Sequence, residues 1–208
     1  MYISKIQYIS PQYQNESYFE ELQKVIEAGA DWIQVRVKDL DYNQWLEVAK
    51  KAVAICKQNG VKCIINDNPN IAIESNADGV HLGKNDMSPL EARKLLGKNK
   101  IIGGTANTFD DIQNLVNQGV DYIGFGPYRF TTTKKNLSPI VGHDGYKSIL
   151  ESCKNNGIST PIIAIGGITG DDVRSILETG IYGFAFSGYI ANAVDKKTII
   201  DDLKKVLA

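Results

Sequence analysis

The sequence predicts an α/β fold, a single (β/α)8 TIM barrel, from three observations. Short apolar runs alternate with segments of helical period along the 208 residues. Most of these runs are apolar on both faces, which is typical of parallel strands covered by helices. The strand–helix unit occurs eight times, and eight units close such a barrel. Because no linker or low-complexity run interrupts the pattern, we expect residues 1–208 to form one domain.

The predicted strands are short and rich in β-branched and aromatic residues. Each one is followed by a segment of helical period, so the order of strand and helix is regular. In chain order, the strands are residues 5–10, 32–37, 62–66, 79–82, 100–105, 122–126, 161–166 and 183–187.

The predicted helices are supported by apolar stripes and by their ends. In residues 42–60, for example, one stripe consists of Trp45, Val48, Ala49, Ala52, Val53 and Cys56. Most of the helices end at a glycine, as expected for a left-handed C-cap, and two begin at an N-cap and proline pair, Asn68–Pro69 and Ser88–Pro89. In chain order, the helices are residues 18–29, 42–60, 69–76, 88–97, 108–119, 145–157, 169–180 and 196–208.

An open doubly wound sheet is the main alternative fold for alternating strands and helices. That fold often carries a G-x-G-x-x-G fingerprint after its first strand. No such fingerprint follows residues 5–10, so the closed barrel is favoured.

The composition argues against several classes of protein. The formal net charge is −1, whereas a nucleic-acid-binding protein shows a basic excess. No apolar run reaches the roughly 20 residues of a membrane-spanning helix, and residues 1–10 lack the apolar core of a signal peptide. Cys56, Cys63 and Cys153 have no metal-ligand spacing and are expected to be reduced, mostly buried thiols. These features predict a cytoplasmic protein.

The functional residues of a (β/α)8 barrel lie where the strands end and the βα loops begin. In the second predicted strand and just beyond it, period-2 alternation places Gln34, Arg36 and Lys38 on one face. Val35 and Val37 lie on the other face and should contact the helices. Two cations and an amide at a barrel mouth favour an anionic ligand over a solvated strand end with ion pairs.

Two carboxylates follow the next two strands. Asp67 and Asp86 each precede a helix, so N-capping and ion pairing to Lys38 are alternatives to a ligand role. The residues directly before the two prolines are better-placed caps. Two carboxylates on neighbouring strand ends suit Mg²⁺, whose other ligands are usually water and substrate phosphate. Asn66 could add an amide contact.

Thr105 ends the fifth predicted strand and offers a hydroxyl group at the barrel mouth. Gly103 and Gly104 precede it, and their lack of side chains would let a ligand approach the backbone. Gly166 and Gly167 lie at the end of the seventh predicted strand, and Ser187 and Gly188 lie at the end of the eighth. Glycines at these two strand ends predict a phosphate-binding site.

The loop after the sixth strand is unusually rich in hydroxyl and ammonium groups. Thr131, Thr133 and Lys134 lie between the cationic side of the barrel mouth and the predicted phosphate site. They could contact anions on both sides, whereas a solvated polar loop would not require this pattern. Two anion pockets and one divalent metal suggest two phosphorylated substrates, or one substrate with phosphates at both ends.

Taken together, these motifs resemble the thiamine-phosphate synthase family, which is sister to the thiazole tautomerases. The resemblance covers nearly the whole chain, in matching order and spacing, through QVRVKD, IINDN, DGVHLGKND, GVDYIGFGPYRFTTTKKN, PIIAIGGI and FAFSG. It implies a (β/α)8 barrel that joins 4-amino-2-methyl-5-hydroxymethylpyrimidine diphosphate to a thiazole phosphate, or to its carboxylate, and releases pyrophosphate. It also implies small-molecule substrates and Mg²⁺, and it leaves open whether the chain forms a homo-oligomer.

The resemblance implies a role for each motif residue. The pyrimidine diphosphate would be bound by Gln34, Arg36, Lys38, Asn66, Thr105 and Lys134. The thiazole phosphate would be bound by Thr131, Thr133, Gly167, Phe186 and Ser187. Asp67 and Asp86 would hold Mg²⁺ against the pyrophosphate. The catalytic residues, which would stabilise the leaving pyrophosphate, are Arg36, Lys38 and Lys134.

Two departures from the family pattern keep alternatives open. Phe186 stands where a small aliphatic residue is usual, which would narrow the thiazole end. The sequence SGYI is similar to that of the tautomerases, for which His81 and His143 would be candidate bases. The retained diphosphate and metal positions favour the synthase, and we expect His81 to form hydrogen bonds inside the barrel. Another phosphate-binding barrel, such as a sugar-phosphate epimerase, and a non-catalytic binding barrel are the remaining alternatives.

Overall fold

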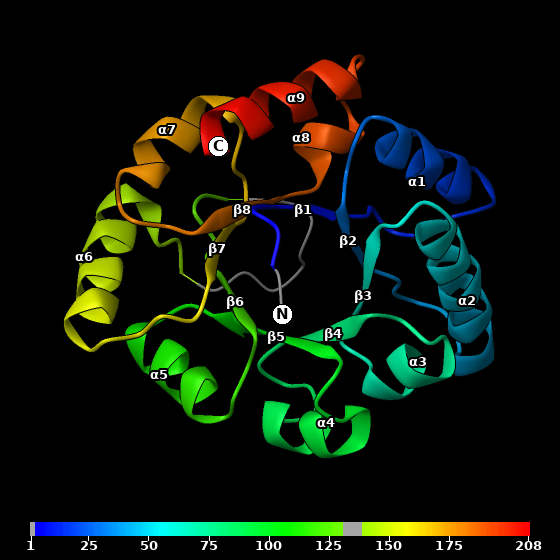
Figure 1. Cartoon of the computed structure of the whole chain (residues 1–208), viewed down its shortest axis with the longest axis horizontal. Helices are drawn as coiled ribbons and strands as arrows, with labels where there is room; N and C mark the ends of the chain where they lie inside the picture. Colours follow the sequence, from blue (N-terminus) through cyan, green and yellow to red (C-terminus); the bar gives the residue numbers. More distant parts are fainter. Residues whose placement is uncertain (1–2, 131–138) are drawn as a thin grey trace.

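The computed structural model describes residues 3–130 and 139–208, and it contains the predicted barrel. Its parallel strands pair in chain order from β1 to β8, and β8 pairs with β1 to close the sheet. Figure 1 shows the strands around the centre and the helices in an outer ring. The strands are β1 (Ile6–Ile9), β2 (Trp32–Val35), β3 (Lys62–Asn66), β4 (Gly79–Leu82), β5 (Ile101–Ala106), β6 (Tyr122–Phe125), β7 (Ile162–Ile165) and β8 (Gly183–Phe186).

The helices agree with the predicted segments, with two differences. Helix α6 begins before residue 145, and a short helix α8, which was not predicted, follows β8. The helices are α1 (Ser17–Glu27), α2 (Tyr42–Gln58), α3 (Pro69–Glu74), α4 (Pro89–Leu96), α5 (Phe109–Asn117), α6 (Gly142–Asn155), α7 (Gly170–Leu177), α8 (Gly188–Ala191) and α9 (Lys196–Leu207). The predicted apolar stripe of α2 is buried in full.

The helix ends follow the predicted chemistry. The glycines after the helices adopt positive φ, for example 76° at Gly97 and 92° at Gly180, a conformation that costs glycine little. The Asn68 side chain accepts hydrogen bonds from the backbone of α3, and Ser88 forms a capping box at α4. Asp67 and Asp86 therefore do not cap these helices, and the N-capping alternative is excluded.

The core has two layers, separated by the sheet. An inner cluster fills the barrel, and most of its members come from strands. An outer cluster between strands and helices includes Val35 and Val37 of the second βα unit. This confirms that the two valines contact the helix layer, and it leaves the alternate positions Gln34 and Arg36 for the inner side.

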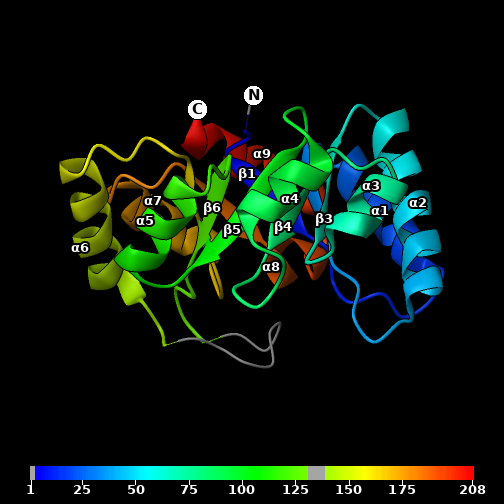
Figure 2. The same ribbon diagram turned by 90° about the horizontal axis from the view of Figure 1, so that it is seen from below.

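Both ends of the chain lie at the same end of the barrel, at the top of Figure 2. The backbone N–H of Phe184 donates to the Lys5 carbonyl at 2.8 Å, which extends the junction between β1 and β8. The Lys5 ammonium group donates to the Leu207 carbonyl at 2.5 Å and ties α9 to this junction.

Within residues 3–130 and 139–208, no helix has the length and apolarity to cross a membrane. Cys56, Cys63 and Cys153 are buried and free, as predicted. Burial raises the pKa of the Cys153 thiol. A hydrogen bond with Cys56, together with burial, raises the pKa of the Cys63 thiol. A raised pKa disfavours the reactive thiolate form.

Candidate active site

A pocket of about 910 Å³ lies at the carboxyl ends of the strands. It brings together ten of the residues predicted from the sequence: Gln34, Arg36, Lys38, Asn66, Asp67, Asp86, Thr105, Gly167, Phe186 and Ser187. The other three, Thr131, Thr133 and Lys134, lie outside the described residues. Residues from most of the strand ends therefore share one cavity, as expected for an active site of this fold.

The end of β2 presents its polar side chains to this pocket. Gln34 is buried, Arg36 is half-buried, and Lys38 is exposed, so the polarity increases toward the mouth. The strand ends at Val35, and the backbone N–H of Arg36 then donates to the Ser10 hydroxyl at 3.0 Å. This bond holds the chain beyond the strand and directs the two cations to the pocket.

Asp67 leaves β3 in an unusual backbone conformation. Its φ is 67°, a left-handed value that Asp adopts more readily than most residues. Its backbone N–H donates to the His81 carbonyl at 2.7 Å, which fixes the turn against β4. The carboxylate accepts a hydrogen bond from the Asn66 amide and forms an ion pair with Lys38. The ion pair with Lys38, one of the expected alternatives, is therefore present.

Asp86 lies beside Asp67 in the same pocket. Its carboxylate accepts a hydrogen bond of 2.6 Å from the backbone N–H of Gly83. Burial is the largest cause that raises the pKa of Asp86, and the charge of the Asp67 carboxylate is the second. The hydrogen bond from Gly83 and the charge of Lys38 oppose the rise. The two carboxylates are thus close enough to repel each other.

This repulsion is what a divalent cation would relieve, so the residues fit Mg²⁺. Among the residues that the structure describes, no group of three or more His, Cys, Asp or Glu side chains could enclose a metal ion. Two carboxylates with open positions are typical of Mg²⁺ bound together with water and substrate phosphate, rather than of a closed metal cage.

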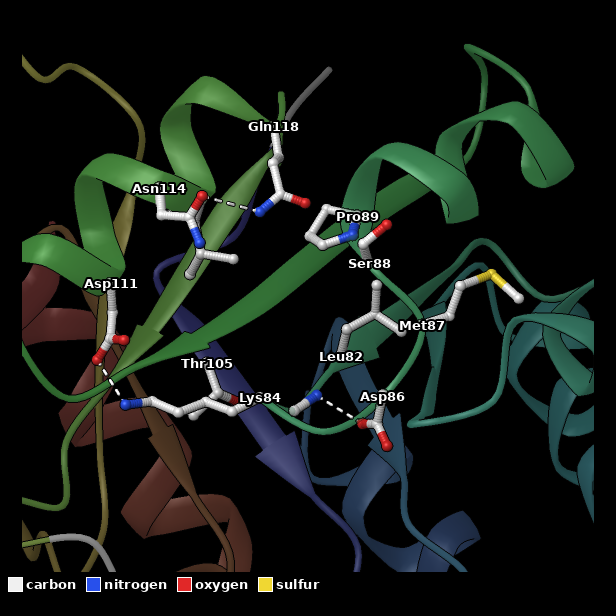
Figure 3. Close-up of a pocket in the computed structure, with 12 residues that line it drawn as sticks. Leu82, Lys84, Asp86, Met87, Ser88, Pro89, Thr105, Asp111, Asn114 and Gln118 are labelled. Atoms are coloured by element: carbon white, nitrogen blue, oxygen red, sulfur yellow. Dashed lines mark hydrogen bonds and ion pairs between the residues drawn. The ribbon is translucent and has the colours of Figure 1, made fainter.

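A smaller hollow of about 290 Å³ adjoins the pocket between α4 and α5 (Figure 3). Lys84, which lines both cavities, forms an ion pair of 2.6 Å with Asp111 at the start of α5. Burial raises the pKa of Asp111, but hydrogen bonds from Lys84 and from the Asn107 and Thr108 backbone outweigh it, and the pKa is lowered. Asp111 therefore stays ionised and holds Lys84 at the edge of the pocket.

The glycines near the site have packing roles that the sequence did not indicate. A Cβ atom at Gly103 would lie 2.2 Å from the Tyr122 ring, and one at Gly104 would lie 2.5 Å from Leu115. The prediction that these two glycines admit a ligand is therefore wrong. Gly166, with φ of 96°, packs against Pro127, and a Cβ atom there would lie 2.7 Å from that ring. Gly166 and its neighbours nevertheless line the pocket where phosphate binding was predicted.

The two histidines occupy different places. His81 is 5% exposed and forms hydrogen bonds to the Tyr122 hydroxyl at 2.9 Å and the Thr105 hydroxyl at 3.0 Å, which confirms the expected interior role. His143 lies on α6, where Nε2 donates to the Ser175 carbonyl at 3.2 Å, and it does not line the pocket.

Sequence reasoning missed Gln7 and Tyr122, which lie inside the barrel and contact site residues. Gln7 is 1% exposed and Tyr122 is fully buried. Burial raises the pKa of Tyr122, so its hydroxyl keeps its proton. The available signal was a glutamine within the apolar run of β1, because a buried amide requires partners.

Cations, a pair of carboxylates and loop glycines surround one barrel mouth, an arrangement typical of (β/α)8 barrel enzymes that act on phosphorylated ligands. The family model for thiamine monophosphate synthase matches residues 6–190. The thiamine-phosphate synthase of Flavobacterium johnsoniae is 47% identical over 204 residues, which cover 98% of this chain and 96% of the relative. That of Bacteroides fragilis is 45% identical over 202 residues, which cover 97% and 98%. The chain therefore belongs to the thiamine monophosphate synthase family.

Solved structures agree with this assignment. The thiamine phosphate pyrophosphorylase from Pyrococcus furiosus has a TM-score of 0.81 and 27% identity, covering 98% of this chain and 95% of its own. A 3-hexulose-6-phosphate synthase has a TM-score of 0.69 at 15% identity over 99% of this chain and all of its own, which shows the shared fold alone. The chain is a transferase of thiamine biosynthesis that forms thiamine phosphate. The tautomerase and the non-catalytic barrel are not favoured.

Proposed function

We propose that the pocket of about 910 Å³ binds the pyrimidine diphosphate and the thiazole phosphate together, and that Mg²⁺ binds with the diphosphate. The observation that carries this proposal is the juxtaposition of two cations, Arg36 and Lys38, with two carboxylates, Asp67 and Asp86, in one cavity. The cations match the charge of a diphosphate. The carboxylates match a metal ion that would accompany it.

The reaction needs little covalent chemistry from the protein. The C–O bond between the pyrimidine methylene and the diphosphate breaks, and its electron pair leaves with pyrophosphate. The thiazole nitrogen then donates its lone pair to the methylene carbon and forms the new C–N bond. No proton is transferred in either step, so neither a protein nucleophile nor a strong base is required.

The main task of the protein is to stabilise charge that grows on the leaving group. Arg36 and Lys38 would do this from the end of β2, and Lys134 would do it from the loop after β6. Preorganised donors of this kind can each contribute about 10²–10³ in rate. Because Lys38 pairs with Asp67 in the structure, diphosphate binding would exchange one anionic partner for another.

Asp67 and Asp86 would hold Mg²⁺, and Asn66 orients the Asp67 carboxylate through its amide. When bound, Mg²⁺ supplies additional positive charge to the leaving pyrophosphate. At the thiazole end, Gly167, Phe186 and Ser187 would bind the second substrate, together with Thr131 and Thr133. Phe186 is 1% exposed. It would exclude water from the positively charged pyrimidine methylene group that C–O cleavage leaves behind.

The direct test is pyrophosphate release by the purified protein. We expect release when both substrates and Mg²⁺ are present, and none with the thiazole phosphate alone. Lys38→Ala should lower kcat by about 10²–10³, because the lost charge faces the leaving group. Lys50→Ala, which removes an exposed ammonium group on α2, is the matched control. Equal rates for the two variants would contradict the role of Lys38, and absence of pyrophosphate would contradict the proposal.

A further inference from the structure

A chain of hydrogen-bonded side chains extends from one wall of the pocket, through the barrel interior, to another wall. We call it the interior chain. Its steps are Gln34 Nε2 to Gln7 Oε1 at 3.1 Å, Gln7 Nε2 to Tyr122 Oη at 3.2 Å, Tyr122 Oη to His81 Nδ1 at 2.9 Å, and His81 Nε2 to Thr105 Oγ1 at 3.0 Å. Both ends of the interior chain, Gln34 and Thr105, line the pocket.

The surrounding residues are arranged to accommodate the interior chain. A Cβ atom at Gly103 would lie 2.2 Å from the Tyr122 ring, and one at Gly124 would lie 3.0 Å from the His81 ring. Trp32 packs edge-on against Tyr122, with ring centroids 4.8 Å apart. Small residues thus stand where the two rings need space, and the rings have little freedom to turn.

The direction of each hydrogen bond follows from the donors and acceptors. An amide N–H can only donate, so Tyr122 Oη accepts the bond from Gln7 Nε2. The single phenolic proton is then directed to His81, whose Nδ1 must accept it. The ring proton of a neutral imidazole therefore lies on Nε2 and is donated to Thr105.

The direction of the interior chain sets what the pocket offers to a ligand. Gln34 uses its amide nitrogen inside the barrel, so its amide oxygen is the group that can accept a bond in the pocket. Thr105 accepts from His81, so its own hydroxyl proton is available for donation. The pocket thus presents an acceptor on the β2 side and a donor on the β5 side.

We propose that Gln7, Tyr122 and His81 are positioning residues that hold Gln34 as an acceptor and Thr105 as a donor. An aminopyrimidine matches this pair, because its exocyclic amino group donates and its ring nitrogen accepts. The corresponding pyrimidinone carries a carbonyl group in place of the amino group and would face the Gln34 oxygen with a second acceptor. The interior chain therefore selects the amino form of the substrate. This inference rests on the proposed function.

The first test measures the histidine tautomer in the ligand-free protein. Long-range ¹H–¹⁵N NMR spectra distinguish a proton on Nδ1 from one on Nε2. The protein has two histidines, so a His143→Gln variant leaves His81 as the sole histidine signal. We expect His81 to carry its proton on Nε2. A proton on Nδ1, alone or in addition, would overturn the proposed direction.

The second test compares binding of the amino and oxo forms of the pyrimidine diphosphate by calorimetry with Mg²⁺ present. The two ligands share the diphosphate, so the ratio of their affinities reports on the ring alone. We expect the wild-type protein to bind the amino form at least about tenfold more tightly, because one mismatched hydrogen bond costs roughly a factor of ten or more. Tyr122→Phe, which removes the proton that orients His81, should abolish most of this preference.

Two further variants separate positioning from packing. Tyr8→Phe is the matched control, because it removes a buried tyrosine hydroxyl that makes no hydrogen bond among the described residues. His81→Gln keeps an N–H near the position of Nε2 and should retain more of the preference than His81→Phe. An unchanged ratio in Tyr122→Phe, or an equal loss in Tyr8→Phe, would overturn the proposal. If the protein bound neither pyrimidine diphosphate, the proposed function would be contradicted. The tautomer measurement would still decide the direction of the interior chain.

Discussion

At the scale of single residues, the most informative pair is Asp67 and Asp86. Asp67 directly precedes the helix cap Asn68, and Asp86 lies two residues before the cap Ser88, yet neither carboxylate is a cap itself. Asp67 adopts a left-handed φ of 67°, and the pKa of Asp86 is raised by burial and by the Asp67 charge. Both features carry an energetic cost in the folded protein. Such costs are typical of residues retained for a ligand.

Loss of either carboxylate should therefore reduce turnover strongly and in a non-additive way. Asp67→Asn and Asp86→Asn each remove one hard oxygen ligand from the same proposed ion. The double variant should be little worse than the worse single variant, because the ion acts with both ligands as a unit. The measurement is pyrophosphate release at saturating Mg²⁺. Wild-type rates in either single variant would refute the proposed metal site.

The raised pKa of Asp86 also predicts a dependence of stability on pH. A carboxyl group whose pKa is higher in the folded state costs stability once it is ionised, and this cost disappears as the pH falls below its ordinary pKa. In the presence of a chelator, Asp86→Asn should therefore raise the melting temperature at pH 7. The gain should shrink toward pH 3, where aspartic acid is protonated in both states. A variant that is less stable at pH 7 under these conditions would contradict the cause given for the raised pKa.

At the scale of elements, the sequence predicted the strands and most of the helices because hydrophobic period and cap chemistry are local. The alternation in β2 correctly placed Gln34 and Arg36 opposite the valines, and the residues before prolines are the caps. Helix α8 was missed because it is one turn long and has no apolar period. The roles of Gly103 and Gly104 were wrongly predicted because the atoms that fill their space come from the next strand and helix.

The contact between β5 and β6 gives a prediction at this scale. Gly103→Ala would place a methyl group 2.2 Å from the Tyr122 ring, so the ring or the strand must move. Overpacking of this kind typically costs about 1–3 kcal/mol of folding free energy. Gly188→Ala is the control, because its added Cβ would meet its nearest atom at 3.5 Å. Urea unfolding of both variants tests this, and equal stability would show that the ring adapts without cost.

At the scale of the whole molecule, the pocket draws residues from both halves of the barrel. Its lining includes Gln34 from β2, Asp67 after β3, Thr105 from β5 and Phe186 from β8. The strand order that brings them together was predictable from the count of βα units, but the pairing of Gln7 with Tyr122 was not. These two residues are 115 positions apart, and no local pattern relates them. Closure of the barrel, rather than any one motif, creates the interior chain.

A ligand that contacts several strand ends should stabilise the whole barrel. Pyrophosphate with Mg²⁺, each at about 100 times its dissociation constant, should add about 2.7 kcal/mol or more to the free energy of unfolding. For a chain of this size, each 1 kcal/mol raises the melting temperature by roughly 2–4 °C. We therefore expect an increase of about 5–10 °C, measured by differential scanning calorimetry. In the Asp67→Asn, Asp86→Asn double variant, Mg²⁺ should add nothing to the effect of pyrophosphate alone. If Mg²⁺ still stabilised that variant, the ion would be held by phosphate and water rather than by these two carboxylates.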